Sequence, residues 1–279
     1  MTPVFSSLHI SIAADELFHI GPLPVTNAMV LGGMGVAVLL AVFFYAAAKL
    51  RRGEKNFLVS LVQWAFEGMY GTCEDIVGDK KMARSIAPLA LTIFFVVLAT
   101  YWISIIPGVG ESLTWHGKPL LRGLPADLNF TFGLAIVTMV AVQIYAIKQH
   151  GFFGNAGRYL INPLKNPIGA FEGILELVGE FSRLVALSLR LFGNAFAGEV
   201  LLMIIAVLTS YFATVTLPFF MAFELFIGFI QAYVFFVLTL IFAALATAGH
   251  GSHDTDEKKT IQDPVHSPTV RSSQAGHAE

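Results

Sequence analysis

Long stretches without a charged side chain alternate with short polar segments along most of this chain. Five such apolar stretches occur, at residues 21–48, 85–110, 128–147, 200–223 and 225–249. Each can supply the roughly 20 residues that an α-helix needs to cross a hydrocarbon layer about 30 Å thick. Lipid offers no hydrogen bonds to an open backbone, so such segments must be helical. The pattern therefore predicts five membrane helices.

Residues 56–79 have a different pattern. They are too polar to span, yet their apolar side chains recur at helical spacing along one side, and Trp64 and Tyr70 suit the level of the lipid headgroups. This pattern predicts an amphipathic helix on the cytoplasmic membrane surface. A small soluble helical hairpin is the alternative, which the short chain between the flanking apolar stretches disfavours.

The last two apolar stretches belong to long helices. The penultimate helix is expected over residues 167–208 and the last over 217–248, with Pro218 marking the turn between them. The predicted fold is an all-α membrane protein with about five membrane helices and one amphipathic surface helix. The last two membrane helices are expected to form a long tilted hairpin.

Lysine and arginine residues are distributed asymmetrically around these helices. With alternating helix directions, 13 of the 17 basic residues fall on one side, Lys118 and Arg122 fall on the other, and Arg183 and Arg190 lie within the membrane. Because cytoplasmic loops carry the excess of basic residues, the N-terminus is predicted outside and the C-terminus inside. The expected parts are an extracytoplasmic segment at 1–20, a membrane domain at 21–250 and a disordered cytoplasmic tail at 251–279.

Composition agrees with a lipid environment. Charged residues make up 13% of the chain, against about a quarter in soluble domains, and the mean hydropathy is +0.71. The net charge of −2 provides no basic field, so no nucleic-acid partner is expected. The single cysteine, Cys73, excludes an internal disulfide and a cysteine cluster for a metal. We expect no cofactor and no metal.

Polar residues of the penultimate helix fall on one stripe. At about 100° per residue, six of them lie within about 80° of one another: Glu172, Glu176, Glu180, Arg183, Arg190 and Asn194. Glu199 lies on the other side of the helix, about 140° from Glu176. For Glu172 and Arg183, ordinary charge pairs at a solvated helix start explain the pattern at least as well as a function does.

Arg190 stands apart from this explanation because it has no acid three or four residues away. A lone arginine in lipid costs about 2.5–3.5 kcal/mol on insertion scales, so it is expected to face water, a partner or a mobile counter-charge. Arginine keeps its proton, whereas carboxylic acids titrate and can carry protons. A fixed cation flanked by acids on two sides suits a proton path with a barrier in its middle.

The last helix carries two more polar residues. Glu224 and Gln231 are seven residues apart and share a face, and an antiparallel hairpin would bring Glu199 past them. A purely structural hydrogen bond between helices is the competing explanation for Glu224 and Gln231, but intramembrane acids are functional by default. Asp127, at the outer end of the third span, is either a further member of this group or a helix N-cap.

Three motifs give the chain a family resemblance. Residues 188–199 (SLRLFGNAFAGE), 228–239 (GFIQAYVFFVLT) and 125–131 (PADLNFT) resemble the signature segments of subunit a of the F-type ATP synthases. The resemblance extends from about residue 18 to residue 247. It implies a non-catalytic stator subunit in a prokaryotic plasma (inner) membrane. The implied partners are a ring of c subunits, b-type peripheral stalk subunits, the rest of the F-type ATP synthase, and the lipid bilayer.

The resemblance also implies roles for individual residues. Arg190 matches the essential arginine between two offset half-channels, through which protons reach and leave the carboxyl groups of the c-ring. Glu176 matches an acidic position of the inner half-channel, and some members of the family carry His where this chain has Glu224. The outer half-channel is matched by Asn194, Glu199, Glu224 and Gln231, with Asp127 near its mouth.

Two other functions fit part of the pattern. A secondary transporter could bind a small anion at Arg190, but such transporters tend to show internal repeats, and none is visible. A membrane-embedded hydrolase would need a nucleophile with a base, or a metal, and every histidine is expected outside the spans. The chain has no phosphate-binding loop, so any nucleotide chemistry must belong to partner subunits.

Overall fold

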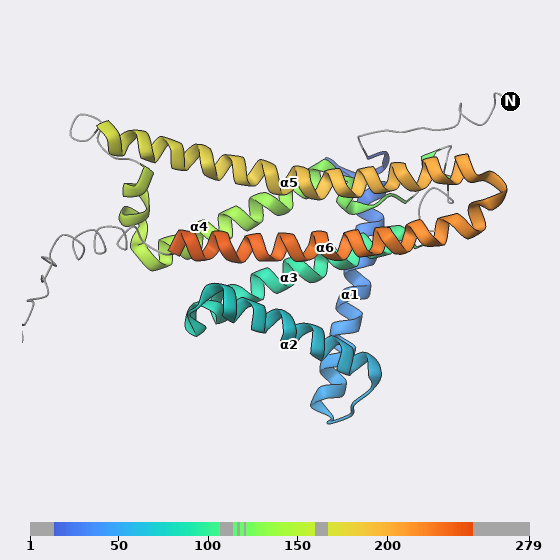
Figure 1. The fold of residues 1–279 in the computed structure, drawn as a ribbon, viewed down its shortest axis with the longest axis horizontal. Helices are drawn as coiled ribbons and strands as arrows, with labels where there is room; N and C mark the ends of the chain where they lie inside the picture. Colours follow the sequence, from blue (N-terminus) through green and yellow to red (C-terminus); the bar gives the residue numbers. More distant parts are fainter. Residues whose placement is uncertain (1–13, 107–113, 116–117, 120, 160–166, 248–279) are drawn as a thin grey trace, which may run out of the picture. The chain divides into compact units, whose positions relative to one another are not determined.

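The computed structural model of the protein describes residues 14–106, 114–115, 118–119, 121–159 and 167–247. The predicted tail at 251–279 and most of the predicted segment at 1–20 lie outside these residues. Within them the helices are α1 (Asn27–Arg51), α2 (Phe57–Val77), α3 (Lys80–Ile105), η2 (Leu124–Ala126), α4 (Leu128–Tyr159), α5 (Pro167–Thr209), η3 (Ser210–Phe212) and α6 (Ala213–Thr247) (Figure 1).

The prediction of an all-α membrane protein is confirmed. Among the described residues, α1, α3, α5, α6 and the Leu128–Phe152 part of α4 are long and apolar enough to cross a membrane.

Helix α4 is broken at Gly151, whose φ of 76° lies in the left-handed region that glycine adopts at low cost. His150 was expected in a loop, but it lies in the last turn of the α4 span, where its ring contacts the carbonyl of Thr247.

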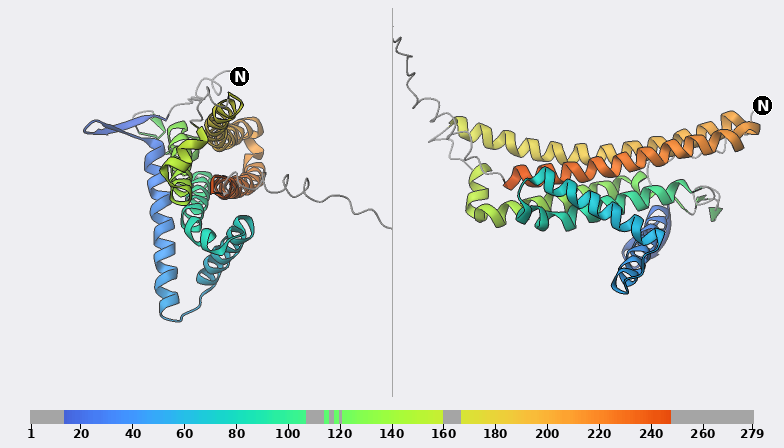
Figure 2. Two further views of the ribbon diagram at one scale, coloured as in Figure 1. Left: turned by 90° about the vertical axis from the view of Figure 1, so that its left-hand side faces the viewer. Right: turned by 60° about the horizontal axis from the view of Figure 1, so that its bottom comes forward.

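The predicted hairpin of the last two membrane helices is present, but its turn is not at Pro218. Helices α5 and α6 lie side by side along most of their length and are joined by η3, Ser210–Phe212 (Figures 1 and 2). Pro218 lies inside α6 instead. The apolar pattern at 200–223 contains no charge that marks where the chain reverses. Pro218 removes one backbone hydrogen bond of α6, which membrane helices tolerate.

The start of the first membrane helix was also misplaced. The apolar stretch begins at residue 21, but Glu16–Ile20 (β1) and Leu23–Thr26 (β2) form a small antiparallel hairpin that turns at Gly21. Prolines at positions 22 and 24 disfavour a helix there. Helix α1 begins at Asn27, and the Thr26 hydroxyl caps it by accepting from the backbone N–H of Met29. A second small hairpin pairs Thr114–Trp115 (β3) with Lys118–Pro119 (β4).

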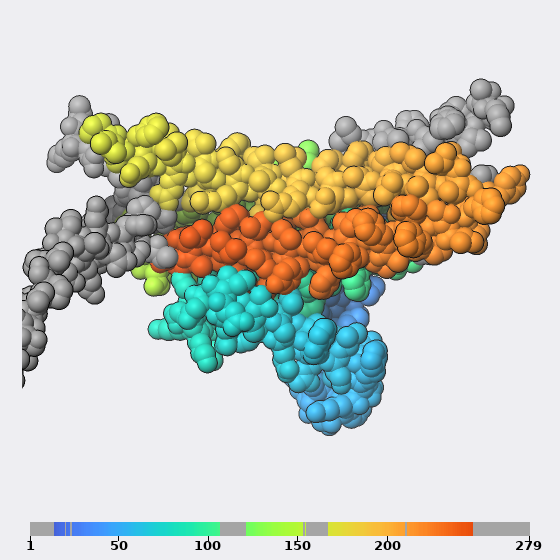
Figure 3. Space-filling model, viewed as in Figure 1, coloured from blue at the N-terminus to red at the C-terminus, as the bar shows by residue number. Residues whose placement is uncertain are grey.

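The apolar core lies where α2, α3, α4, α5 and α6 meet. Phe94 of α3 is 2% exposed and packs edge-on against three other phenylalanine rings, Phe95, Phe229 and Phe236. The outer surfaces of α5 and α6, by contrast, expose many large apolar side chains. Figure 3 shows these two helices packed against each other along one face. This arrangement suits a bundle whose solvent is lipid.

Helix α2 confirms the predicted amphipathic helix at 56–79, while its position on the membrane surface stays a prediction. Its Cys73 is fully buried against the core, and Phe57 and Trp64 are exposed by 85% and 73%. Burial raises the pKa of the Cys73 thiol to about 11.

Because the thiolate is the reactive form, Cys73 should react very slowly with maleimide at pH 8. Its labelling rate should rise steeply only as the pH approaches 11, where the deprotonated fraction grows. A cysteine placed at the exposed Ser60 of the same helix in a Cys73→Ser background serves as the control and should label readily at pH 8. Equal rates for the two positions at pH 8 would contradict the packing of α2 described here.

Candidate functional site

The hairpin brings polar residues of α5 and α6 into direct contact. The side-chain amide of Asn194 donates to Oε1 of Gln231 at 2.6 Å. Gln231 is buried, at 3% exposure, whereas Asn194 is exposed. The prediction that this part of α5 passes the Glu224–Gln231 face of α6 is therefore confirmed.

Glu224 lies on α6, closer to the turn of the hairpin than Gln231, at the place where α6 meets α3 and α5. It is only 3% exposed, and its Oε1 accepts a hydrogen bond of 2.6 Å from the Tyr101 hydroxyl of α3. A Cβ on Gly198 of α5 would overlap the Glu224 carboxyl group. The absence of a side chain at Gly198 is thus what lets α5 and α6 approach each other around this acid.

Glu199 is bound by the segment that precedes α4. Its Oε1 accepts from the backbone N–H of Gly123 at 3.0 Å, and its Oε2 lies 3.7 Å from Nε of Arg122. Arg122 also lies over the ring of Phe196, with 5.9 Å between its guanidinium carbon and the ring centre. Glu199 and Glu224 therefore have different partners: a cation and a backbone amide for one, a neutral phenol for the other.

Asp127 caps α4. It is 5% exposed, and its Oδ1 accepts from the backbone N–H of Asn129 at 2.9 Å. This contact confirms the N-cap alternative. The segment that carries Asp127 packs on α5, since Ala126 is buried together with Tyr101 and Ala195. A place for Asp127 near the mouth of a proton path stays a prediction.

Arg190 lies one helical turn before Asn194 on α5. Its side chain is exposed, and it makes no hydrogen bond or ion pair with any residue in the part of the chain that the structure describes. The other intramembrane arginine, Arg183, is half-buried and lies over the ring of Phe242, 5.5 Å from the ring centre. Among the described residues, Arg183 thus has an aromatic partner, and Arg190 has no hydrogen-bond or ion-pair partner.

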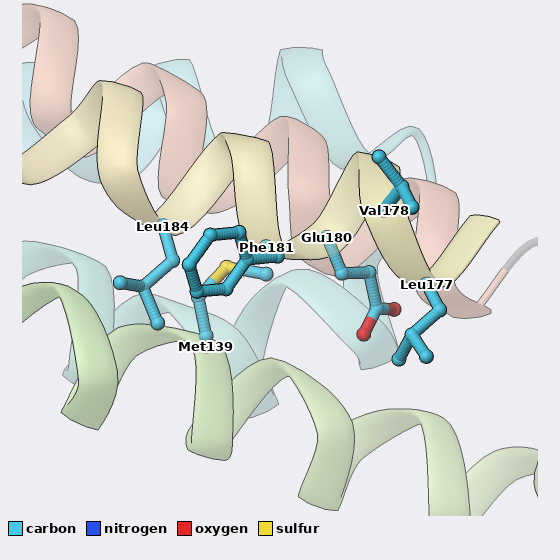
Figure 4. A pocket seen from close by; sticks show the side chains of 6 residues that line it. All are labelled: Met139, Leu177, Val178, Glu180, Phe181 and Leu184. Atoms are coloured by element: carbon cyan, nitrogen blue, oxygen red, sulfur yellow. The ribbon is translucent and has the colours of Figure 1, made fainter. Parts of the chain in front are cut away.

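The acidic positions before Arg190 lie along the N-terminal half of α5. Glu172 is exposed, Glu176 is half-buried, and Glu180 accepts a 2.5 Å hydrogen bond from the side-chain amide of Gln143 on α4. Glu180 also lines a pocket of about 550 Å³ between α4 and α5 (Figure 4). The other lining residues are Met139, Leu177, Val178, Phe181 and Leu184.

The chain is similar to known proteins over most of its length, including the positions described above. A family model described as "ATP synthase A chain" matches residues 29–244. The chain belongs to this family. It is 33% identical over 223 residues to the ATP synthase subunit a of Stutzerimonas stutzeri, covering 77% of this chain and 75% of the relative. It is 32% identical over 213 residues to that of Mycobacterium tuberculosis, covering 75% of this chain and 82% of the relative.

Membership of the ATP synthase A-chain family confirms the resemblance inferred from the motifs and makes this chain a multi-pass membrane component of an F-type ATP synthase. The matched region contains every residue singled out from the sequence, Asp127 through Gln231. Two residues of the site were nevertheless missed. Arg122 was noted only as a basic residue of an outer loop, and Tyr101 was passed over as part of an apolar stretch.

One signal in the sequence could have drawn attention to Tyr101. A buried tyrosine hydroxyl on a membrane helix needs a hydrogen-bond partner, and few acids lie within the membrane segments to supply one. Which acid it meets depends on how α3 packs against α6, and that information is not present in either helix alone.

Replacing Gly198 with alanine should destabilise this site. The added Cβ overlaps the Glu224 carboxyl group, which must turn away and lose its bond to Tyr101. An unsatisfied buried polar group costs about 1–3 kcal/mol, and we expect a loss of that size in the free energy of unfolding. Unfolding of the purified protein by SDS in mixed micelles measures it.

Gly133→Ala in α4 is the matched control, because nothing lies within 4 Å of an added Cβ there. This change should leave stability unchanged or raise it slightly, since alanine favours the helix. Equal effects of the two substitutions would show that Gly198 makes no special room for Glu224.

Proposed function

We propose that this chain is the proton-channel stator subunit of a rotary ATP synthase. Protons pass through two offset half-channels to and from carboxyl groups on a ring of c subunits, and their flow is coupled to ATP synthesis. The chain itself is non-catalytic, and partner subunits carry out the nucleotide chemistry. The observation that carries this proposal is the exposed charge of Arg190 on a membrane helix, which has no partner among the residues that the structure describes.

Arg190 acts as a fixed positive charge because arginine does not lose its proton at any physiological pH. A cation in lipid without a partner in the described part of its own chain is costly, so a counter-charge from outside must approach it. A carboxylate that moves past on a ring supplies such a charge. The guanidinium keeps that carboxylate ionised while it passes and prevents protons from crossing directly between the half-channels.

The surface around Arg190 suits the close approach of another helix. Ala186, Gly193 and Ala197 are exposed and lie four before, three after and seven after Arg190, which places them on the same face of α5. Small residues let helix backbones come together in a membrane. Helix α5 is also the least buried of the five membrane helices, with 17% of its most apolar window buried. These features support a partner that covers this face of α5.

The polar groups beyond Arg190 form the outer half-channel. They follow one another along the hairpin: the Asn194–Gln231 pair, Glu224 with Tyr101, then Glu199 with Arg122. From Arg190 to Glu199 the helix rises about 14 Å, close to half of the hydrocarbon layer. A row of hydrogen-bonding groups over that distance supports proton transfer between the outer surface and the ring, with Asp127 near the mouth.

The acids before Arg190 form the inner half-channel. Glu176 and Glu180 precede Arg190 by 14 and 10 residues on α5, and both are half-buried. They lie on the opposite side of Arg190 from Glu199 along the helix axis, so the guanidinium separates the two acidic groups. This order supports two half-channels that open to opposite sides of the membrane.

The remaining parts of the proposal concern the setting. One proton crossing a 100 mV potential releases about 2.3 kcal/mol, so several protons must be combined to make one ATP, as a rotor allows. The partners are the c-ring, b-type peripheral stalk subunits and the other subunits of the complex. The distribution of basic residues supports a bacterial inner-membrane topology with the N-terminus outside and the C-terminus in the cytoplasm.

Replacing Arg190 with alanine tests the proposal. We expect proton-driven ATP synthesis to fall below detection while the complex still assembles, because the passing carboxylate loses its counter-charge. Synthesis is measured in vesicles that contain the whole complex, after an imposed proton gradient, and assembly by co-purification of the c subunits.

Arg183→Ala is the control, since this second arginine on the same helix has Phe242 as its partner. It should retain most of the synthesis rate. A normal rate in the Arg190→Ala complex would refute the role proposed for Arg190.

A further inference from the structure

Glu224 is attached to a residue from a different helix. Tyr101 of α3 and Glu224 of α6 are 123 residues apart in the chain, yet the phenol donates to Oε1 at 2.6 Å. Both side chains are buried, at 1% and 3% exposure. The position of this acid in the half-channel is therefore set by α3 as well as by its own helix.

The surroundings of this pair are shaped to hold it. A Cβ on Gly228 would overlap the ring of Tyr101, and one on Gly198 would overlap the carboxyl group of Glu224. The neighbouring residue of α3, Trp102, donates from its indole nitrogen to the backbone carbonyl of Leu225 at 3.1 Å. Two consecutive aromatic residues of α3 thus hold two consecutive residues of α6.

The two oxygens of the Glu224 carboxyl group differ as a result. Oε1 is occupied by Tyr101, while Oε2 has no hydrogen-bond partner among the residues that the structure describes. The phenol can donate to Oε1 both when the carboxyl group is ionised and when a proton is on Oε2. The bond to Tyr101 therefore survives proton exchange, provided that the exchange takes place at Oε2.

We propose that Tyr101 is a positioning residue that ties down Oε1 of Glu224 and leaves Oε2 as the oxygen that exchanges protons. This inference rests on the proposed function, since it assigns a role within the outer half-channel. A proton arriving from the outer side binds Oε2 as the O–H bond forms, and the same bond breaks when the proton moves on toward the ring. Tyr101 keeps its own proton throughout.

Other charged groups lie close to this pair. From α5, Glu199 is near enough to Tyr101 for the two groups to interact electrostatically, and Arg122 of the preceding loop lies beside Glu199. The Asn194–Gln231 pair, which does not titrate, follows on the side toward Arg190. Tyr101 therefore bonds to Glu224 and also interacts electrostatically with Glu199, the acid beside Arg122.

Tyr101→Phe tests the inference, because it removes only the hydroxyl and keeps the ring that fits against Gly228. Trp102→Phe is the matched control: it removes the neighbouring hydrogen bond between the same two helices without touching the carboxyl group. Glu224→Gln identifies the signal of this acid. All variants are measured in the whole complex in vesicles, by ATP synthesis driven by a proton gradient and by infrared spectroscopy of the protonated carboxyl band.

We expect Tyr101→Phe to slow synthesis about tenfold, as loss of a hydrogen bond to an ionised group would. The band that disappears in Glu224→Gln should move to higher frequency in Tyr101→Phe, because its carbonyl loses a hydrogen bond. Trp102→Phe should change the rate by less than about twofold and leave the band in place. Equal slowing by both aromatic variants with an unmoved band would reduce Tyr101 to a structural role and overturn the inference.

Glu224→Asp provides a second route to the same answer if the Tyr101 variant assembles poorly. The shorter side chain cannot reach the phenol, so it should reproduce both the slowing and the band shift with Tyr101 intact. An assembled Glu224→Asp complex with a normal rate would overturn the inference. A normal rate in Glu224→Gln would instead remove Glu224 from the proton path and refute that part of the proposed function.

Discussion

A guanidinium group keeps its charge at any physiological pH, and in a lipid layer that charge needs a counterpart. Arg190 has none within the described part of its own chain. It lies on α5, whose 43 residues are about twice the number that a membrane helix needs. The free-energy cost of this arrangement falls when the guanidinium meets water or a counter-charge. The rest of the site is consistent with this requirement, because polar residues approach Arg190 along the helix from both directions.

Small residues make that arrangement possible by two different means. Inside the bundle, Gly198 and Gly228 give room to the Glu224 carboxyl group and the Tyr101 ring, so that these polar side chains pack between helices. On the outer face of α5, the absence of bulk beside Arg190 leaves a surface that a second helix can approach. Small residues thus allow close packing inside the bundle and also line the exposed face of α5 beside Arg190.

Glu199 and Glu224 differ in their surroundings although both are glutamates. Glu199 lies between a backbone amide and an arginine, and Glu224 lies against a phenol in a buried position. Identical side chains in unlike environments are a common way to divide chemical tasks within one site. Here the division depends on α3 and the segment before α4, neither of which contributes to the acidic stripe itself.

Much of this protein follows from its sequence alone. Uninterrupted apolar stretches predict helical membrane segments, since lipid permits no other backbone structure, and helical periodicity determines which polar residues share a face of α5. The stretch at 200–223, however, contains the turn at η3 and not a complete helix. The cost of a lone arginine in lipid likewise singles out Arg190 without any structure. The turn at η3 and the start of α1 could not be predicted, because an apolar pattern carries no mark of where a helix stops inside it. The partners of Glu199 and Glu224 were decided only by tertiary packing, because hydrogen bonds between residues 76 and 123 positions apart depend on how whole helices fit together.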